Sequence, residues 1–167
     1  SDMAVAMLAL DARVEVESHD GTSRQIALDD LYCLPGTTPD IETTLKPGDL
    51  ITAVLLPKPV EASHIYRKVR DRSSYAFALV SIAALVEVDE GKISTAALAF
   101  GGLAPKPWRN RELESALVGN APSDALFDKA ADILLADAQG YGENDFKIPL
   151  ARRTLKAVLR TLTEVSQ

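Results

Sequence analysis

The sequence has few of the residues that build metal centres and nucleophilic sites. Its 167 residues include one cysteine, Cys33, and two histidines, His19 and His64. A single cysteine excludes a disulfide within one chain and a cysteine-rich zinc or iron–sulfur centre made by this segment alone. Two histidines argue against a multi-histidine metal site. Neither a Ser-His-Asp order nor a glycine-rich phosphate loop is present, so an independent small-molecule enzyme is not favoured.

An excess of positive charge and a long apolar run are also missing. The formal net charge is -6, from 24 acidic and 18 basic side chains. This balance argues against a protein that neutralises nucleic-acid phosphates and against a basic membrane-surface module. The longest apolar run, residues 76–86, is well short of the roughly 18 residues that span a membrane. Small molecules and protein partners remain as ligand classes.

The first residues predict a helix followed by a hairpin. Ser1 and Asp2 are N-cap candidates for a helix over residues 3–10. This apolar helix starts abruptly, without the pattern of a signal peptide, as expected of a cut through a larger protein. Residues 13–27 alternate polar and apolar side chains on both sides of a turn, which predicts a hairpin. A helical turn is expected over residues 27–31.

The middle of the chain predicts a four-stranded, mostly antiparallel sheet. Proline and glycine punctuate residues 35–48, which predicts a connection between two structural units. Four apolar or alternating runs follow, at residues 50–56, 64–70, 75–88 and 93–100. A tight turn at Asp89-Glu-Gly-Lys links the last two runs.

The last third of the chain changes to three- and four-residue spacing, which predicts three helices. The first includes residues 113–117, and Ser123 can cap the second. The third has Pro149 near its start and an apolar stripe that extends to Val165. Strands followed by helices predict the α+β class, with a small, mostly antiparallel sheet packed on a three-helix layer.

Charged and aromatic side chains gather at residues 66–75, whose sequence is Tyr-Arg-Lys-Val-Arg-Asp-Arg-Ser-Ser-Tyr. One interpretation is a strand edge that charge protects from pairing, and composition favours it. The other is a positive site that faces an anionic cofactor or an acidic partner. Gly101-Gly102 predicts a backbone crossing or tight turn more than a ligand site. Trp108-Arg109 predicts a packing anchor.

Four segments occur in a distinctive order: Leu-Pro-Gly-Thr-Thr-Pro at 34–39, Lys-Pro-Gly-Asp-Leu-Ile at 46–51, residues 68–81, and Gly-Gly-Leu-Ala-Pro-Lys-Pro-Trp-Arg at 101–109. In this order they resemble the FAD-binding (medium) subunits of the molybdenum hydroxylase family, which includes xanthine dehydrogenase, aldehyde oxidoreductase and carbon monoxide dehydrogenase. The resemblance covers the chain up to about residue 119, and Asn144–Arg153 looks like the family's final helix. It implies a C-terminal portion of such a subunit, preceded by the tail of an α+β FAD-binding subdomain.

The resemblance also implies a division of the chain and a function. Residues 1–45 look like the remnant of the second FAD-binding subdomain, and residues 46–167 like the flavoprotein C-terminal domain. In the family, electrons pass from a molybdenum cofactor through iron–sulfur clusters to FAD and then to an external acceptor. The molybdenum and most iron–sulfur centres lie elsewhere, often on partner subunits of a hetero-oligomeric complex. The alternative is a non-catalytic module that docks those subunits. The cytoplasm is the expected compartment, with the periplasm as the alternative.

Four positions correspond to cofactor-binding residues of the family. Asp2 matches an aspartate that hydrogen-bonds the flavin nucleotide, and Ile51 matches an aliphatic residue near the isoalloxazine ring. Lys68 matches a lysine close to the flavin, where a fixed cation would stabilise the charge gained on reduction. Tyr75 stands at a position where relatives vary. A helix N-cap is the plainer interpretation of Asp2, and core packing that of Ile51. Because nothing here resembles the family's glycine-rich pyrophosphate loops, we expect the 167-residue chain alone to bind FAD weakly or not at all.

Overall fold

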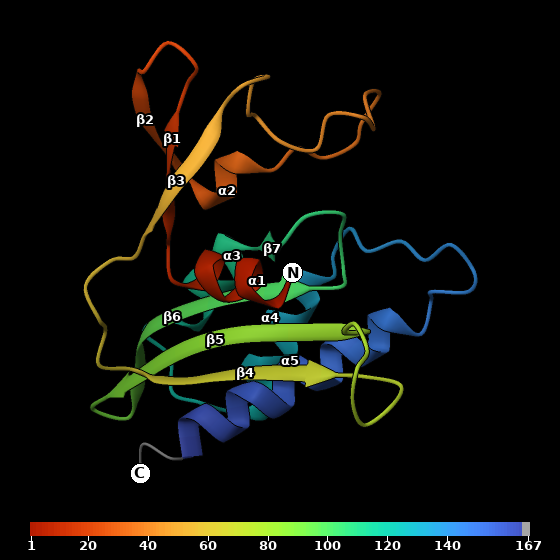
Figure 1. Cartoon of the computed structure of the whole chain (residues 1–167). Coiled ribbons are helices and arrows are strands. Elements are labelled where there is room, and N and C mark those ends of the chain that lie inside the picture. Colours follow the sequence, from red (N-terminus) through yellow and green to blue (C-terminus); the bar gives the residue numbers. More distant parts are fainter. Residues whose placement is uncertain (165–167) are drawn as a thin grey trace.

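The computed structural model describes residues 1–164, and its two antiparallel sheets lie on either side of the first helix (Figure 1). The helices are α1 Asp2–Ala9, α2 Leu28–Leu31, α3 Arg111–Leu117, α4 Asp124–Leu134 and α5 Lys147–Glu164. The strands are β1 Arg13–Glu17, β2 Ser23–Ala27, β3 Leu50–Leu55, β4 Ser63–Val69, β5 Val80–Asp89, β6 Lys92–Gly101 and β7 Trp108–Arg109. Val165, predicted to end the last helical stripe, lies outside the described residues. None of the helices within residues 1–164 has the length and apolar character needed to cross a membrane.

The larger sheet has the strand order β4-β5-β6-β7, and every pairing in it is antiparallel. Its long β5–β6 hairpin turns at Glu90 and Gly91, which have positive φ angles of 47° and 75°. Two residues with positive φ match the right-handed twist of the flanking strands, so this turn favours a close hairpin. The predicted tight turn at residues 89–92 is confirmed.

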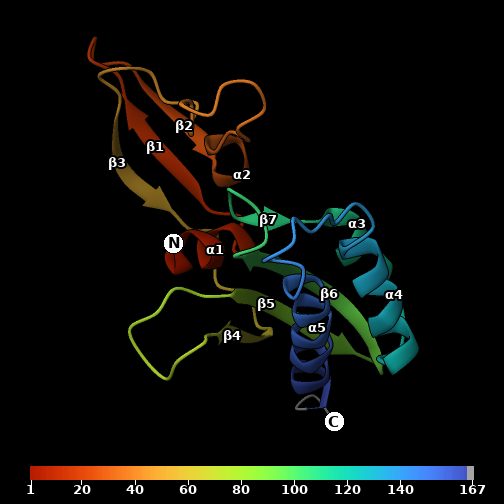
Figure 2. The same ribbon diagram turned by 90° about the vertical axis from the view of Figure 1, so that its right-hand side faces the viewer.

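Both faces of the larger sheet are covered, which explains the unbroken apolar run in β5 (Figure 2). Ile82, Ala84 and Val86 are buried in one hydrophobic cluster with residues of α3, α4 and α5. The alternate residues Ala83 and Leu85 are buried in a second cluster with α1. Successive side chains of a strand point to opposite faces, so a strand buried on both sides needs no polar alternation. The predicted α+β layer is confirmed.

The smaller sheet has the order β2-β1-β3, and it corrects one part of the prediction. The hairpin of residues 13–27 is confirmed. The 50–56 strand, however, does not join the larger sheet, because β3 pairs with β1, with Val54 opposite Val14. β7 takes the fourth place in the larger sheet instead. The turn before β3 is fixed to the hairpin by the carboxylate of Asp49, which lies 2.6 Å from Arg24 Nη2 and accepts from Ser18 Oγ at 2.8 Å.

The third predicted strand, residues 75–88, begins later than expected. β5 starts at Val80, and residues 70–79 form a loop. Tyr75 has a φ of 56°, a left-handed conformation that a strand cannot contain. Phe77 is 96% exposed. The run is apolar in composition, but the strand begins only where both faces are covered.

The three predicted helices are confirmed. Ser123 caps α4 by accepting from the Leu126 amide, and Asn110 caps α3 in the same way. Gly119, with a φ of 81°, follows the end of α3 in the left-handed conformation common after helices. On α5, the third of the predicted helices, Leu155, Val158 and Leu159 are fully buried against the larger sheet.

Candidate functional site

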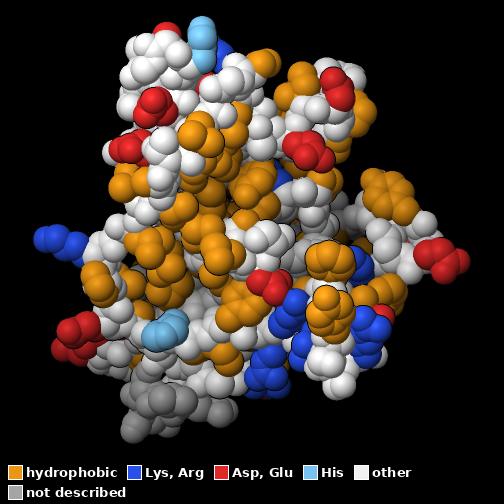
Figure 3. All heavy atoms as spheres, viewed as in Figure 1, with side chains coloured by type: hydrophobic (Ala, Val, Ile, Leu, Met, Phe, Trp, Pro, Cys, Tyr) orange, Lys and Arg blue, Asp and Glu red, His pale blue; other side chains and the backbone are white. Residues whose placement is uncertain are grey.

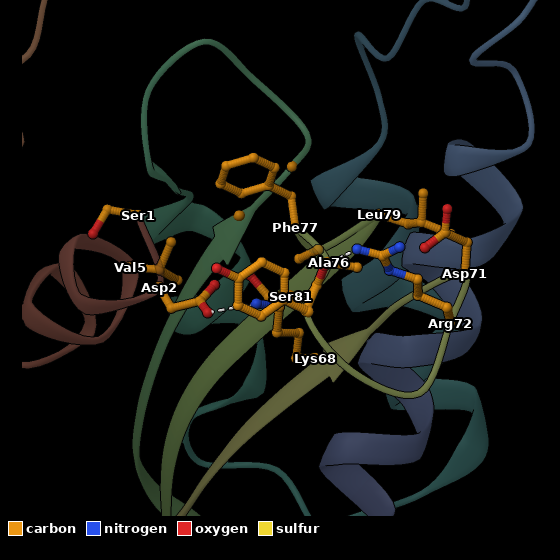
Figure 4. A pocket seen from close by; sticks show the side chains of 14 residues that line it. Ser1, Asp2, Val5, Lys68, Asp71, Arg72, Ala76, Phe77, Leu79 and Ser81 are labelled. Carbon is orange, nitrogen blue, oxygen red and sulfur yellow. Dashed lines mark hydrogen bonds and ion pairs between the residues drawn. The ribbon is translucent and has the colours of Figure 1, made fainter.

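A cavity of about 1050 Å³ lies where the N-terminus of α1 meets the ends of β4, β5 and β6 (Figure 4). The loop of residues 70–79 forms its outer wall. Its lining residues are Ser1, Asp2, Val5, Lys68, Asp71, Arg72, Tyr75, Ala76, Phe77, Ala78, Leu79, Ser81, Gly101 and Gly102. The cavity therefore combines an ionic pair, aromatic rings and small apolar side chains from segments far apart in the sequence.

A chain of hydrogen bonds joins α1 to the sheet in this cavity. Lys68 Nζ donates to Asp2 Oδ2 at 2.7 Å, and the Tyr66 hydroxyl lies 2.9 Å from Asp2 Oδ1. The Tyr66 hydroxyl also lies 3.1 Å from Ser81 Oγ. Tyr66 and Lys68 lie on the same face of β4 because they are two residues apart. That face is the one that meets α1, so the strand directs both side chains to Asp2.

These contacts shift two ionisation equilibria. The hydrogen bond from the Lys68 ammonium lowers the pKa of the Asp2 carboxyl below its ordinary value, and the Tyr66 hydroxyl acts in the same direction. Burial raises the pKa of Tyr66 to about 12, and the neighbouring Asp2 carboxylate adds to that effect. At neutral pH the site therefore contains a charged aspartate held between an ammonium and a neutral phenol.

Two glycines allow β6 to approach its neighbours at the cavity floor. A Cβ atom on Gly101 would lie 2.4 Å from Ser81 Oγ and 2.9 Å from a Val5 methyl. A Cβ atom on Gly102 would lie 2.6 Å from the Leu79 carbonyl oxygen, and Gly102 also has a φ of 78°. Neither position tolerates a side chain without displacing backbone or buried atoms. The interpretation of Gly101-Gly102 as a close backbone crossing is confirmed.

The outer wall presents aromatic rings and a cation. Tyr75 is 95% exposed and Phe77 is 96% exposed, although both line the cavity. Arg72 donates to the Tyr75 carbonyl oxygen, which fixes the guanidinium beside this wall. Figure 4 shows Phe77 and Arg72 on the loop that forms this wall, and Asp2 and Lys68 joined by their hydrogen bond on the other side of the cavity. A flat ligand could contact a ring and a cation at the same time.

The predicted site residues do not all meet. Asp2, Lys68 and Tyr75 line this one cavity although Tyr75 is 73 residues from Asp2 in sequence. Ile51 lies on β3 in the other sheet, is 40% exposed, and is not among the lining residues. The flavin-binding roles of these four residues stay predictions. Ser1 Oγ accepts from the Ala4 amide at 3.4 Å, so the N-cap belongs to Ser1 and Asp2 is available for Lys68.

Two polar residues of the site were not singled out by the sequence. Ser81 is buried at the start of β5, and Tyr66 bridges it to Asp2. A serine within the otherwise apolar residues 79–86 was the available signal, since a buried hydroxyl requires a partner. Tyr66 was recognised only as part of the charged cluster.

Arg109 fixes the other end of α1. Its guanidinium donates to the carbonyl oxygens of Leu8 and Ala9 at 2.6 and 3.2 Å, and to Glu114 Oε1 at 2.7 Å. The side chains of Arg109 and Glu114 are 2% and 8% exposed, so this ion pair is buried. Trp108 packs partly buried against the larger core. The predicted packing anchor is therefore confirmed, and Arg109 adds a polar clamp on the helix that carries Asp2.

Two known protein families match two successive parts of this chain. Residues 64–162 match the CO dehydrogenase flavoprotein C-terminal domain. This chain belongs to that family. Residues 1–59 match the FAD binding domain in molybdopterin dehydrogenase. The resemblance to the FAD-binding subunits of molybdenum hydroxylases is confirmed.

Individual relatives support this assignment. The chain is 51% identical over 159 residues to the aldehyde oxidoreductase FAD-binding subunit PaoB of Escherichia coli (strain K12), which covers 95% of this chain and 47% of that protein. It is 32% identical to the glyceraldehyde dehydrogenase medium chain of Sulfolobus acidocaldarius, with 75% and 42% covered. The crystal structure of the cyanide-inactivated Cu,Mo-CO dehydrogenase contains a chain with a TM-score of 0.84 and 25% identity, with 98% and 56% covered. The chain spans about half the length of the curated relatives it matches.

Proposed function

We propose that this chain is part of the FAD-binding subunit of a molybdenum-containing oxidoreductase that oxidises aldehydes. In this proposal the subunit passes electrons from iron–sulfur clusters through FAD to an external acceptor, while partner subunits carry the molybdenum cofactor and the clusters. The observation that carries the proposal is the cavity in which Asp2 and Lys68 form an ion pair beside exposed aromatic rings. The relatedness to an aldehyde oxidoreductase FAD-binding subunit supports the choice of substrate class.

The residues of the cavity fit a flavin. A volume of about 1050 Å³ is at the upper end of what protein pockets offer to cofactor-sized ligands. Phe77 and Tyr75 line the cavity with aromatic rings on which a flat ligand could stack. Arg72 and Lys68 supply positive charge for phosphate or for a reduced ring.

Each polar residue would have a distinct part in holding the cofactor. Bound FAD would supply the ability to accept two electrons and release them singly. Asp2, kept ionised by Lys68, would accept hydrogen bonds from the nucleotide. Lys68 would keep a fixed positive charge near the ring and so favour its reduction. Tyr66 holds Asp2 from the second side at 2.9 Å, which orients the carboxylate.

The test of Lys68 separates a flavin role from a docking role. We expect Lys68→Ala in the complete subunit to lower the rate of flavin reduction or acceptor turnover about tenfold or more, because a fixed charge is lost. Assembly with the partner subunits, measured by size-exclusion chromatography, should survive. Lys58→Ala, at an exposed position between β3 and β4, is the matched control. Loss of assembly with Lys68→Ala alone would favour the alternative, a non-catalytic docking module.

A flavin titration tests how much of the FAD site this segment holds. We expect the 167-residue chain to bind FAD weakly or not at all, and the full-length subunit to bind it tightly. Absorbance and fluorescence of added FAD measure both. Stoichiometric tight binding by the short chain would contradict this expectation.

The division of the chain and its compartment also remain proposals. Pairing of β3 with β1, and the family matches that end at residue 59 and resume at residue 64, support a boundary after β3. Proteolysis of the complete subunit would test this position against the boundary near residue 45 that the resemblance implies.

We propose the cytoplasm as the compartment, which cell fractionation would test against the periplasm.

A further inference from the structure

Helix α5 begins with a lysine, at a position where the electrostatics of a helix favour an acid. The unpaired amides of the first turn are partly positive, so carboxylates stabilise this end of a helix and cations do not. The first turns of α1, α3 and α4 each contain an acidic residue, whereas α5 has Lys147 there instead. The stability of α5 itself therefore does not explain a lysine at this position.

The side chain of Lys147 contacts the backbone at the edge of the large cavity. Its Nζ donates to the carbonyl oxygen of Gly102 at 2.9 Å, although the two residues are 45 apart in the sequence. Gly102 lines the cavity, and Lys147 lies outside its lining residues. Lys147 is therefore connected to the cavity through the Gly102 peptide group.

Gly102 is a residue whose conformation has to be held by its surroundings. Its φ of 78° is one of many that glycine can adopt, because no Cβ atom restricts the backbone. A Cβ atom here would lie 2.6 Å from the Leu79 carbonyl oxygen, so the backbone of Gly102 passes close to the chain that leads into β5. Residues 103–107 then form a loop whose far end is tied down by Lys106, which donates to the Asp29 carbonyl oxygen at 3.3 Å. Lys147 holds the end of this loop that lies at the cavity.

The connection between α4 and α5 brings Lys147 to this place. Asn144 Oδ1 accepts from the Tyr141 amide at 2.7 Å, and Asp145 Oδ1 accepts from the Gly142 amide at 2.9 Å. A Cβ atom on Gly140 would overlap the Asp145 carboxylate, so this turn is closely packed. Figure 1 shows the connection, in blue, returning to the larger sheet where α5 begins. The local sequence thus builds a turn that fixes the start of α5.

Lys147 differs from the other cations at this end of the molecule. Figure 3 shows Lys and Arg side chains gathered near the end of the larger sheet. Arg67 and Arg70, which line a shallow hollow there, are exposed. Lys147 is half-buried, and its ammonium group is bonded to a backbone carbonyl oxygen. A solvated surface charge needs no such partner, so the contact indicates a structural task for this lysine.

We propose that Lys147 is a positioning residue of the flavin site, which holds the Gly102 peptide group in the conformation that completes the cavity floor. This inference rests on the proposed flavin function and adds to that site a residue of α5. Without the ammonium group, the Gly102 carbonyl oxygen loses its donor and the glycine regains conformational freedom. Binding of the cofactor would then have to order this backbone again, which weakens affinity. The effect therefore falls on FAD binding more than on the stability of the chain.

The experiment uses the full-length subunit after removal of its FAD. Lys147→Met removes the donor but keeps an unbranched side chain that suits a helix. Lys147→Arg keeps a cation that can donate to the carbonyl oxygen. Lys129→Met, at an exposed position on α4, is the matched control. Fluorescence titration measures the dissociation constant of FAD, and circular dichroism measures the melting temperature of the FAD-free subunit.

We expect Lys147→Met to bind FAD about tenfold more weakly than the wild type, because the cavity floor is no longer ordered in advance. Its melting temperature should stay within about 3 °C of the wild type, since the side chain lies at the surface end of α5. Lys147→Arg should restore most of the affinity, and Lys129→Met should resemble the wild type in both measurements.

Three results would overturn the inference. They are an unchanged FAD affinity in Lys147→Met, an equal loss of affinity in Lys129→Met, and a loss of affinity that comes with a large fall in melting temperature. The last would show that Lys147 supports the fold of α5 in general. Failure of the proposed function is a separate result, because the wild-type subunit would then not bind FAD.

Discussion

In the larger sheet both faces are covered by helices of the same chain, whereas in the smaller sheet no residue of β3 is buried. All of the first seven residues of β5 are buried. On β3, by contrast, Leu50, Ile51 and Val54 are 66%, 40% and 45% exposed. The two sheets are similar in strand propensity and apolar composition. They differ in burial, and the stabilising burial is concentrated in the larger sheet.

The largest expected effect comes from breaking the better-packed region. Leu155 is fully buried between α5 and the sheet, so Leu155→Ala should destabilise the chain by about 2–5 kcal/mol through lost burial and a residual cavity. Val54→Ala on β3 should change the free energy of unfolding by less than about 1 kcal/mol, because the side chain is already near water. Urea unfolding measures both. Equal losses would show that the two sheets do not differ in this way.

A somewhat smaller effect is expected at the joint between the regions. Arg109→Met would remove the nearer of the two cations that contact the buried Glu114, and the side-chain donor to the Leu8 and Ala9 carbonyl oxygens, which costs about 3 kcal/mol. The loss should loosen α1, so the smaller sheet should unfold at a lower temperature than the larger one. Circular dichroism and hydrogen exchange would reveal two transitions. Arg111→Met, at a side chain that is 55% exposed, is the control and should keep one transition.

The smallest effect is expected in the smaller sheet and appears only in acid. The hydrogen bond from Arg24, followed by the Lys46 amide, holds the pKa of the Asp49 carboxyl well below its usual range. A lowered pKa in the folded state stabilises the fold above the ordinary value near 4, and the contribution is lost as pH falls further. The melting temperature of the wild type should therefore fall more steeply below about pH 4 than that of Asp49→Asn.

Asp40→Asn, on the exposed loop before β3, is the matched control and should follow the wild type. Parallel pH curves for the wild type and Asp49→Asn would show that this carboxylate does not fasten β3 to the hairpin.

A structural feature could be predicted from the sequence where neighbouring residues determine it. Helix caps such as Ser123 and the Glu90-Gly91 turn are set by neighbouring residues, and both were predicted. The partner of β3 is not local. An apolar run between prolines indicates a strand but contains no information on which sheet it joins. The start of β5 was misplaced for a related reason, since residues 75–79 are apolar enough for a strand but lack a covered face.

The candidate site shows the same division. Asp2 and Lys68 were both selected because they match residues of the family. Nothing in the sequence around either residue indicates that the two side chains meet. Tyr66 and Ser81 were not selected, since their roles arise from the face of β4 that meets α1. Ile51 was selected with them but lies in the other sheet. Local pattern therefore identifies elements, and the assembly of the site depends on contacts between distant ones.

The position of α1 has a consequence for the order of folding. Its eight residues come well before β5 and β6 in the sequence, yet they pack on both strands and are clamped by Arg109. An isolated helix of this length is not stable in water, so α1 has no lasting structure until its partner strands have left the ribosome. The larger sheet can begin to form without it, and closing the long intervening loop is slow. Helix α1 should thus be among the last parts of this segment to become ordered, and formation of the Asp2–Lys68 ion pair would report that the whole segment has folded.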